Sequence, residues 1–331
     1  MKMGCEKRRF CRKWVMRALV VLVPGFSHLS LGAILEPLRV LGDLAPEVGI
    51  SVELGAIGDT AVPSSSGEIV LARSDFGECL LKLSARSRPD VLFFCAGLKT
   101  PYKAQKDIQK LLRTAHRAGV TIFGTGCAAW KFADAGILQE GAGTVHWTTL
   151  PAFAERHRNI TAKDALFVTS EQATSTPGDA ATLDMVVRFI EARFSEEKAR
   201  YVCAHLMMNY PRAGDAPQPR DAALRDAPEK LRRMIDVMGA NLETPLPVRE
   251  VAALAGVSLR QAQRLFAEHL GATPKRHYLR LRLDHSRLLI EQTAMSILEV
   301  SIASGFSSRR KFTRDYVEAF GFPPTATRRT P

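Results

Sequence analysis

The chain has 331 residues, and its 46 Lys and Arg side chains outnumber 34 Asp and Glu side chains, for a net charge of +12. This length is sufficient for two domains, each with its own core. The charge is unevenly distributed, because residues 229–331 carry +7, residues 1–15 carry +5 and residues 16–228 are neutral. The basic end therefore favours a polyanionic partner. No apolar stretch is long enough to span a membrane.

Residues 1–15 form a basic tail that we expect to be disordered, and Met16 would offer a start directly before the first strand. The apolar run at 18–23 ends at Pro24 and is too short for the core of a signal peptide. The six cysteines show neither metal-ligand spacing nor a disulfide framework, which fits a reducing cytosol. We therefore expect a cytoplasmic protein with no metal and no cofactor.

Residues 16–208 alternate short apolar segments with helical patterns. This alternation predicts an α/β domain in which a parallel sheet is covered by helices on both faces. Ligands of such sheets bind beyond the carboxyl ends of the strands, here after Val23, Cys95 and Gly124. We expect strands at 18–23, 51–57, 91–95, 121–124 and 165–169, and helices at 31–44, 103–118, 128–135, 150–156, 178–194 and 196–207.

Several short motifs follow one another in order along this domain. They are Pro24-Gly25-Phe26-Ser27, Glu36-Pro37-Leu38-Arg39, Ala133-Asp134-Ala135-Gly136, Thr144-Val145-His146-Trp147 and Ser175-Thr176-Pro177-Gly178-Asp179. On these motifs, residues 16–208 resemble the class I glutamine amidotransferase-like sensor domain of the PfpI type. The resemblance implies a flavodoxin-like, amidotransferase-like fold that senses a ligand.

Catalytic members of that superfamily place a cysteine on the turn after a strand, where backbone amides can hold an oxyanion. Counting back from Gly136, that position falls on Gly126, and Cys127 comes one residue late. A working Cys127–His146 pair is one interpretation, and a buried thiol near a hydrogen-bonded histidine is the other. The displaced cysteine favours the second, so we expect no catalytic residue and no enzyme activity.

The resemblance and the strand-end positions also indicate where an effector would bind. A carboxylate at Glu36 could hold a cationic small molecule, or it could be a surface charge paired with Arg39, and both interpretations stay open. The resemblance suggests an amino acid or a quaternary amine, so the expected effector is a small nitrogenous metabolite. The candidate ligand residues are Phe26, Glu36, Gly97, Cys127 and His146.

Residues 209–228 are polar and contain four prolines and Gly214. This composition predicts a linker with no evident structure to fix the spacing of the parts that it joins.

After the linker, one pattern occurs twice, about fifty residues apart. The first copy contains Ala255-Gly256-Val257-Ser258 and closes at Gly271; the second contains Ser304-Gly305-Phe306-Ser307 and closes at Gly321. In each copy a short helix ends at a glycine, which adopts the left-handed conformation cheaply. A serine can then cap a longer helix whose exposed side is basic. The pattern predicts a duplicated helix-turn-helix, and a helix at about 275–292 could set both copies on one face of a DNA duplex.

Cationic and amide side chains occupy the exposed side of the second helix in each copy. Guanidinium groups suit phosphates and the guanine edge, and glutamine can pair with adenine. We expect Arg260, Gln261, Arg310 and Lys311 to read bases, with Arg264 and Arg314 at least partly on phosphates. The alternative, solvated charges on ordinary helices, is disfavoured by the repeat. The candidate DNA contacts are Ser258, Arg260, Gln261, Arg264, Ser308, Arg309, Arg310, Lys311 and Arg314.

Residues 229–331 resemble the AraC/XylS-type DNA-binding domain through Leu254-Ala255-Gly256-Val257-Ser258, Arg280-Leu281-Arg282-Leu283, Ala303-Ser304-Gly305-Phe306-Ser307 and Phe320-Gly321-Phe322-Pro323-Pro324. One departure is Ser301, where the family usually has alanine. The resemblance implies a transcription regulator that binds double-stranded DNA, and we expect an activator that responds to the effector as a homodimer. The alternative is an amidase or protease-like cysteine hydrolase with an accessory DNA-binding module.

Overall fold

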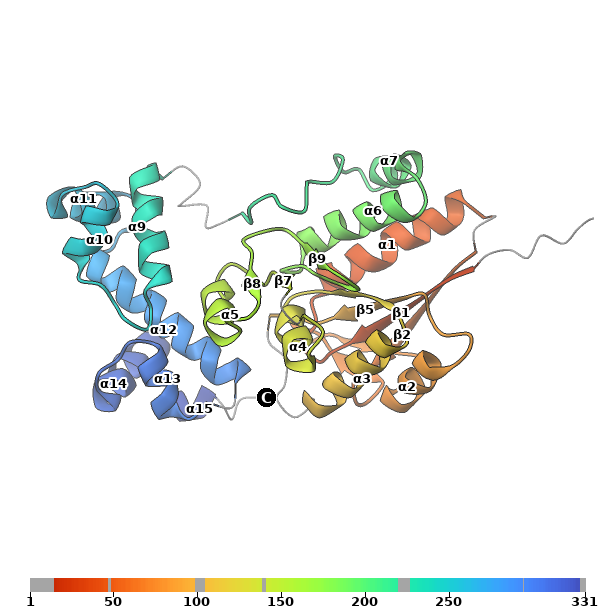
Figure 1. Cartoon of the computed structure of the whole chain (residues 1–331), viewed down its shortest axis with the longest axis horizontal. Coiled ribbons are helices and arrows are strands. Elements are labelled where there is room, and N and C mark those ends of the chain that lie inside the picture. Colours follow the sequence, from red (N-terminus) through yellow and green to blue (C-terminus); the bar gives the residue numbers. More distant parts are fainter. Residues whose placement is uncertain are drawn as a thin grey trace, which may run out of the picture.

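The computed structural model describes residues 15–46, 49–98, 105–138, 141–219, 227–293 and 295–327. They form two bodies that lie side by side along the long axis of the molecule (Figure 1). Residues 15–219 build an α/β body, and residues 227–327 build a helical body. The basic tail expected at 1–15 lies outside the described residues, except for Val15 in the first strand. Among the described helices, none is both long and apolar enough to cross a membrane.

The α/β body contains a six-stranded central sheet. Its first four strands are parallel neighbours, as the alternating pattern predicted. The strand at the far edge is antiparallel, so the sheet is mixed rather than fully parallel. The order is β2 (Gly49–Ala56), β1 (Val15–Leu22), β5 (Val91–Cys95), β6 (Thr121–Gly124), β10 (Ala173–Ser175) and β9 (Val168–Ser170).

The prediction of a strand at 165–169 needs to be corrected. It covers only Val168–Ser170, and its neighbour β10, which was not expected, is the strand that pairs in parallel with β6. Glu171 and Gln172 alone join β9 to β10, and Glu171 adopts a φ of 45°. A connection of two residues can only form an antiparallel hairpin, because a parallel pair needs a much longer crossover.

Helices cover both faces of the sheet. Alternate side chains of each strand point to opposite sides, so apolar side chains on both faces need to be buried. Val20 and Leu22 face one core, and Leu19 and Val21 face the other. The first face is covered by α1 (His28–Leu44), α6 (Ala180–Arg193) and α7 (Glu196–His205). The second is covered by α2 (Phe76–Ser84), α3 (Gln105–Arg117), α4 (Ala128–Ala135) and α5 (Leu150–Arg156).

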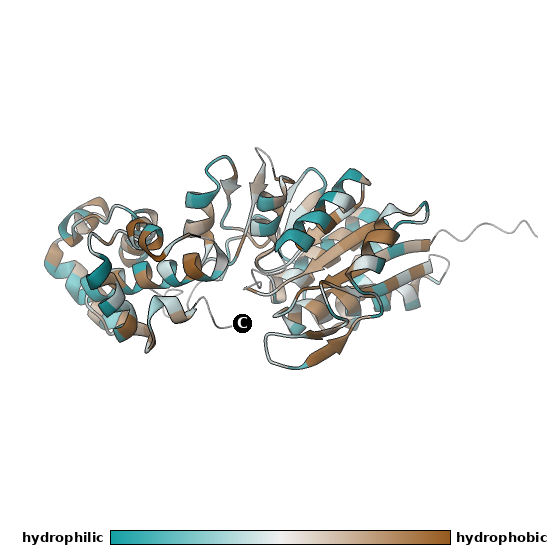
Figure 2. Cartoon of the chain, turned by 90° about the horizontal axis from the view of Figure 1, so that it is seen from below, coloured by the Kyte–Doolittle hydropathy of each residue, from teal (hydrophilic) through white to brown (hydrophobic). Residues whose placement is uncertain are grey.

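Some elements of this body were not expected from the sequence. Helix α2 begins with a reciprocal capping box between Asp75 and Glu78. The other unexpected elements are strands of two or three residues, in which no alternating pattern can develop. They form the pairs β3 (Ala61–Pro63) with β4 (Ile69–Leu71) and β7 (Ala142–Gly143) with β8 (Thr161–Ala162). Within the α/β body, the strands of the central sheet are coloured mostly as hydrophobic (Figure 2).

The first part of the predicted linker is held against the α/β body. Nη2 and Nε of Arg212 both donate to Oδ2 of the buried Asp184, at 2.6 and 3.1 Å, and the Arg212 backbone N–H donates to Oδ1 at 2.9 Å. The backbone at Gly214 and Ala216 accepts hydrogen bonds from the segment before β9. The expectation that nothing fixes this connection is therefore wrong for residues 209–219, and residues 220–226 lie outside the described ranges.

The helical body confirms the duplicated helix-turn-helix. The core of the first copy is formed with α9 (Glu229–Ala240) by the side chains of Val251, Ala252, Ala262 and Phe266. The second copy also has a core of buried side chains, which are Val300, Ala303, Phe312 and Tyr316. The helices are α9 (Glu229–Ala240), α10 (Val248–Leu254), α11 (Leu259–Leu270), α12 (Pro274–Gln292), α13 (Ile297–Ala303), α14 (Arg309–Phe320) and α15 (Pro324–Thr327).

Candidate nucleic-acid interface and ligand site

The turn of the first copy follows the geometry that its sequence predicts. Gly256 has a φ of 69°, and Ser258 caps α11 by accepting a hydrogen bond from the backbone N–H of Gln261. The Gln261 side chain completes the capping box, since its Oε1 accepts from the Ser258 backbone N–H at 2.9 Å. This bond leaves the amide Nε2 as the group that Gln261 can offer to a base. Gly271, with a φ of 60°, ends the helix.

The turn of the second copy repeats this arrangement but is more tightly enclosed. Gly305 has a φ of 73°, and a Cβ there would lie 2.5 Å from the carbonyl oxygen of Leu242 and 2.6 Å from Pro245. Glycine is therefore required for its conformation and for a close approach to the loop after α9. Ser308 caps α14 through the backbone N–H of Lys311.

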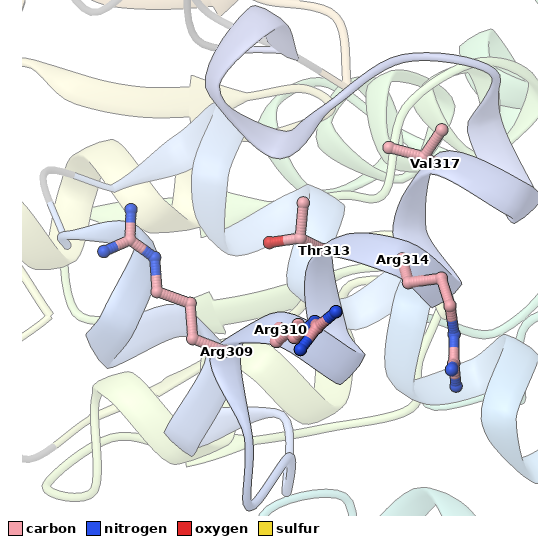
Figure 3. Close-up of a pocket in the computed structure, with 5 residues that line it drawn as sticks. All are labelled: Arg309, Arg310, Thr313, Arg314 and Val317. Carbon is pink, nitrogen blue, oxygen red and sulfur yellow. The ribbon is translucent and has the colours of Figure 1, made fainter.

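The basic face of α14 is exposed and largely without counter-charges. Arg309, Arg310 and Lys311 have no carboxylate partner within the described part of the chain. Arg314 lies 3.1 Å from the buried Asp315, which holds its side chain along the helix. A shallow hollow beside α14 is lined by Arg309, Arg310, Thr313, Arg314 and Val317. Figure 3 shows these side chains on α14, with the three guanidinium groups spread apart.

The exposed face of α11 is less basic. Arg260 is exposed and has no acidic partner among the described residues. Arg264 lies 3.7 Å from Glu268, one turn further on, and both side chains are more than half exposed. A pair of this kind contributes little to stability. The guanidinium group of Arg264 can therefore exchange Glu268 for a phosphate at small cost.

Helix α12 holds the two copies through side chains one turn apart. The Tyr278 hydroxyl donates to the Asn241 carbonyl oxygen at 2.6 Å, at the loop after α9. Arg282 donates to the carbonyl oxygens of Ser304 and Gly305, at 2.9 and 2.6 Å, and stacks on Phe306. Burial lowers the pKa of Arg282. The signal in the sequence was an arginine on the buried side of a helix.

The loops at the strand ends of the α/β body approach one another closely. The strand-end glycine Gly97 is buried, and a Cβ there would lie 2.0 Å from the carbonyl oxygen of Gly25. Phe26 is fully buried in the core, and Cys127 is only 3 % exposed at the start of α4. These three candidate ligand residues therefore shape the backbone around the site more than they offer side chains to it.

Gly126 lies in the turn after β6, at the position where the resemblance predicts a cysteine in catalytic members. Its φ is 65°, and a Cβ there would lie 2.3 Å from the Gly97 carbonyl oxygen and 2.6 Å from that of Ala96. Any side chain at this position would have to displace backbone atoms. Cys127 follows with its backbone N–H donating to the Gly97 carbonyl oxygen at 2.8 Å.

His146 and Glu36 lie in different surroundings. The His146 ring is half-buried, its Nδ1 lies 2.7 Å from Thr148 Oγ1, and burial lowers its pKa despite an opposing effect of Asp179. Glu36 is exposed on α1 and forms an ion pair with Arg39 at 2.8 Å. The surface-pair interpretation of Glu36 thus corresponds to an observed contact.

A carboxylate that was not among the candidate ligand residues, although it belongs to one of the motifs, lies at the strand ends. Asp179 accepts a hydrogen bond from the Ser27 hydroxyl, and its backbone N–H donates to Ser30 Oγ at 2.7 Å. It precedes α6 with a φ of 49°, yet its side chain does not cap that helix. No cation among the described residues pairs with it. The only signal in the sequence was the Pro177-Gly178-Asp179 turn after a short polar strand.

Comparisons with known proteins place the chain in a family. Residues 251–330 match the model of a helix-turn-helix domain. The chain is 32% identical over 318 residues to the HTH-type transcriptional regulator GlxA of Rhizobium meliloti, across 95% of this chain and 96% of that protein. It is 30% identical over 310 residues to the HTH-type transcriptional regulator CdhR of Pseudomonas aeruginosa, across 93% and 90%. The chain belongs to the AraC-type helix-turn-helix transcriptional regulators.

A crystal structure of an AraC family transcriptional regulator from Pseudomonas putida shares the fold of part of this chain. The two are 20% identical with a TM-score of 0.52, over 58% of this chain and 99% of that one. In this AraC-type regulator the duplicated helix-turn-helix is the DNA-binding part.

We expect Arg282→Ala to loosen the second helix-turn-helix from α12. The substitution removes two hydrogen bonds donated by a charged group. The loss of each bond is expected to lower the free energy of unfolding by about 1.5–3 kcal/mol. Urea titration of the regulator measures this loss. Arg276→Ala, an exposed change on the same helix, should stay within about 0.5 kcal/mol. Equal stability of the two variants would contradict the anchoring role.

Proposed function

We propose that this regulator activates transcription in response to a small nitrogenous metabolite bound at the strand ends of its α/β body. The observation that carries the proposal is the exposed basic face that occurs twice, on α11 and on α14. These helices follow an α/β body in which the Asp179 carboxylate, at the strand ends, pairs with no cation among the described residues. Helix α12 has 19 residues, or about 28 Å at 1.5 Å per residue. Together with the helices that it carries, it could span successive major grooves about 34 Å apart.

Specific DNA is the proposed partner of this helical body. Arg260, Arg310 and Lys311 would read bases, with the Gln261 amide as a further donor, and Arg264, Arg309 and Arg314 would hold phosphates. Ser258 and Ser308 would lie beside the backbone at the two helix starts. A gel shift with DNA upstream of the regulator's own and neighbouring genes tests the proposal. We expect a retarded complex that weakens steeply with salt. Failure to bind, together with cysteine-dependent hydrolysis, would favour the hydrolase alternative.

The proposed effector site lies around Gly126, where the loops after β1, β5, β6 and β10 meet. Asp179 and the Ser27 hydroxyl would receive a cationic nitrogen, and His146 would line the same side. Phe26, Gly97 and Cys127 would shape the walls, with Glu36 further along α1.

A thermal-shift screen of nitrogenous metabolites tests this site, because a ligand that binds only the folded state raises the melting temperature. We expect at least one hit whose shift is lost in Asp179→Asn and kept in Cys127→Ser. Loss of the shift in Cys127→Ser would instead indicate a covalent role for the thiol.

We also propose that the regulator acts in the cytoplasm as a homodimer joined by its α/β bodies. One chain offers two recognition helices, which suffice for one half-site, and two half-sites supply the further contacts that tight binding needs. Sedimentation of the full chain should give about twice the 36.4 kDa of the monomer. A monomer that binds the operator with undiminished affinity would contradict this assembly.

A further inference from the structure

The two bodies of the regulator meet where α5 contacts α12 (Figure 1). Glu155 Oε2 on α5 lies 3.1 Å from Nε2 of His285 on α12. The His285 side chain is 3 % exposed and that of Glu155 is 24 % exposed. Nε2 of His285 is buried and forms no aligned hydrogen bond among the described residues, so the Glu155 carboxylate is the polar group that faces it. A second pair, Arg158 with Glu243, bridges the bodies at 3.8 Å in solvent.

Helix α5 also reaches back to the strand ends. Its N-cap residue, Thr149, donates its backbone N–H to the His146 carbonyl oxygen at 2.8 Å. Phe153 packs edge-on against Trp130 of α4, with ring centroids 5.2 Å apart. Helix α4 starts directly after Gly126 and Cys127. One end of α5 therefore rests on the loop of His146, and its other end carries Glu155 to α12.

The chain leaves the α/β body at the same loop. The Gln218 side chain is 4 % exposed and accepts from the backbone N–H of Trp147 at 2.8 Å. Its Nε2 donates to the Val145 carbonyl oxygen and to Thr144 Oγ1, at 2.9 and 3.1 Å. These bonds lie on both sides of His146. A shift of this loop would therefore move both α5 and the exit of the chain toward α9.

We propose that the α5–α12 contact is a latch, closed by Glu155 and His285, through which the loop of residues 144–149 sets the position of the DNA-binding body. Without effector the latch is closed and fixes α12, and with it both recognition helices. Occupation of the strand-end site displaces the loop and opens the latch. This last step rests on the proposed effector site, whereas the latch itself does not. The His285 ring is buried against α5, so separating the two helices would expose it, and we expect the contact to be either formed or broken.

The latch can be tested in the full chain without any effector. Nitroxide labels on ketone-bearing amino acids that replace Glu197 and Lys275, both exposed, avoid the native cysteines and report the distance between the bodies. Double electron–electron resonance between the two labels should give one narrow distance distribution for the parent protein. Glu155→Lys and His285→Glu should each broaden or shift it, and the double variant should restore it, as a double-mutant cycle requires of residues in contact. Asp43→Lys, an exposed carboxylate on α1, is the matched control and should change nothing.

Two further variants keep the test informative if His285→Glu does not fold. Glu155→Gln removes the charge without touching the helical body and should also broaden the distribution. Gln218→Ala should broaden it while Glu155 and His285 remain. Both Glu155→Lys and Glu155→Gln should change operator affinity in the same direction, by about fivefold or more, the usual range of coupling between sites.

A narrow, unchanged distribution in Glu155→Lys and Glu155→Gln would overturn the latch, and so would a double variant that behaves like the single ones. If the distributions change as expected but no metabolite raises the melting temperature, the effector proposal fails and the latch stands.

Discussion

Replacing Arg310 with alanine is expected to weaken operator binding by about 1–3 kcal/mol and to relax the preference at one base pair. Arg310 lies near the start of α14, is exposed and has no acidic partner among the described residues. A guanidinium group in this position can reach a guanine edge in the major groove. Fluorescence anisotropy with the operator and with single-base variants of it measures both effects. Arg260→Ala should behave similarly at a second position, set by α11.

Arg314→Ala is the matched control on the same helix. Its guanidinium group is held beside Asp315 and is expected to contact phosphate, so its loss should weaken all sequences evenly and reduce the salt slope. Unchanged operator affinity in both Arg260→Ala and Arg310→Ala would show that α11 and α14 do not enter the grooves in this way.

Gly126→Cys should destabilise the α/β body without creating a hydrolase. A left-handed conformation costs a residue with a Cβ roughly 1–2 kcal/mol, and the new atom would also press on the backbone oxygens of Gly97 and Ala96. At 2–4 °C for each kcal/mol in a domain of this size, we expect the melting temperature to fall by about 4 °C or more. Differential scanning calorimetry measures the fall, and Gly58→Ala, a left-handed glycine in open space, separates the steric part from the conformational part.

The outcome bears on the choice between sensor and enzyme. A Gly126→Cys variant that keeps the parent melting temperature and hydrolyses amides or esters would mean that the turn after β6 can still carry a catalytic cysteine. A destabilised, inactive variant would mean that the strand-end backbone has closed around glycine.

Much of the fold was predictable because its signals are local. The bounds of β5, β6, α4 and α5 agree with the predicted ranges, since each is a clear apolar run or a periodic segment between breakers. The duplicated helix-turn-helix was equally clear, because a glycine, a capping serine and a helical stripe recur in register. Strands of two or three residues and the hairpin of β9 and β10 were missed, because their pairing depends on neighbours in space rather than on a pattern in the chain.

The candidate ligand site illustrates the limit of such patterns. Glu36 was singled out from its motif, yet on the folded chain it lies in a surface pair with Arg39. Asp179 was not singled out, although folding brings it to Ser27 across 152 residues of sequence. Gln218 was assigned to an unstructured linker, and its side chain is buried against the loop of His146.

Sequence alone was enough to establish the helix-turn-helix repeat and the α/β pattern, because caps, breakers and periodicity act within a few residues. The tertiary structure decided which side chains meet at the strand ends, how the linker is held and that α5 contacts α12 through Glu155 and His285. These contacts join residues far apart in the chain, and they depend on the register and packing of whole elements, which no local pattern encodes.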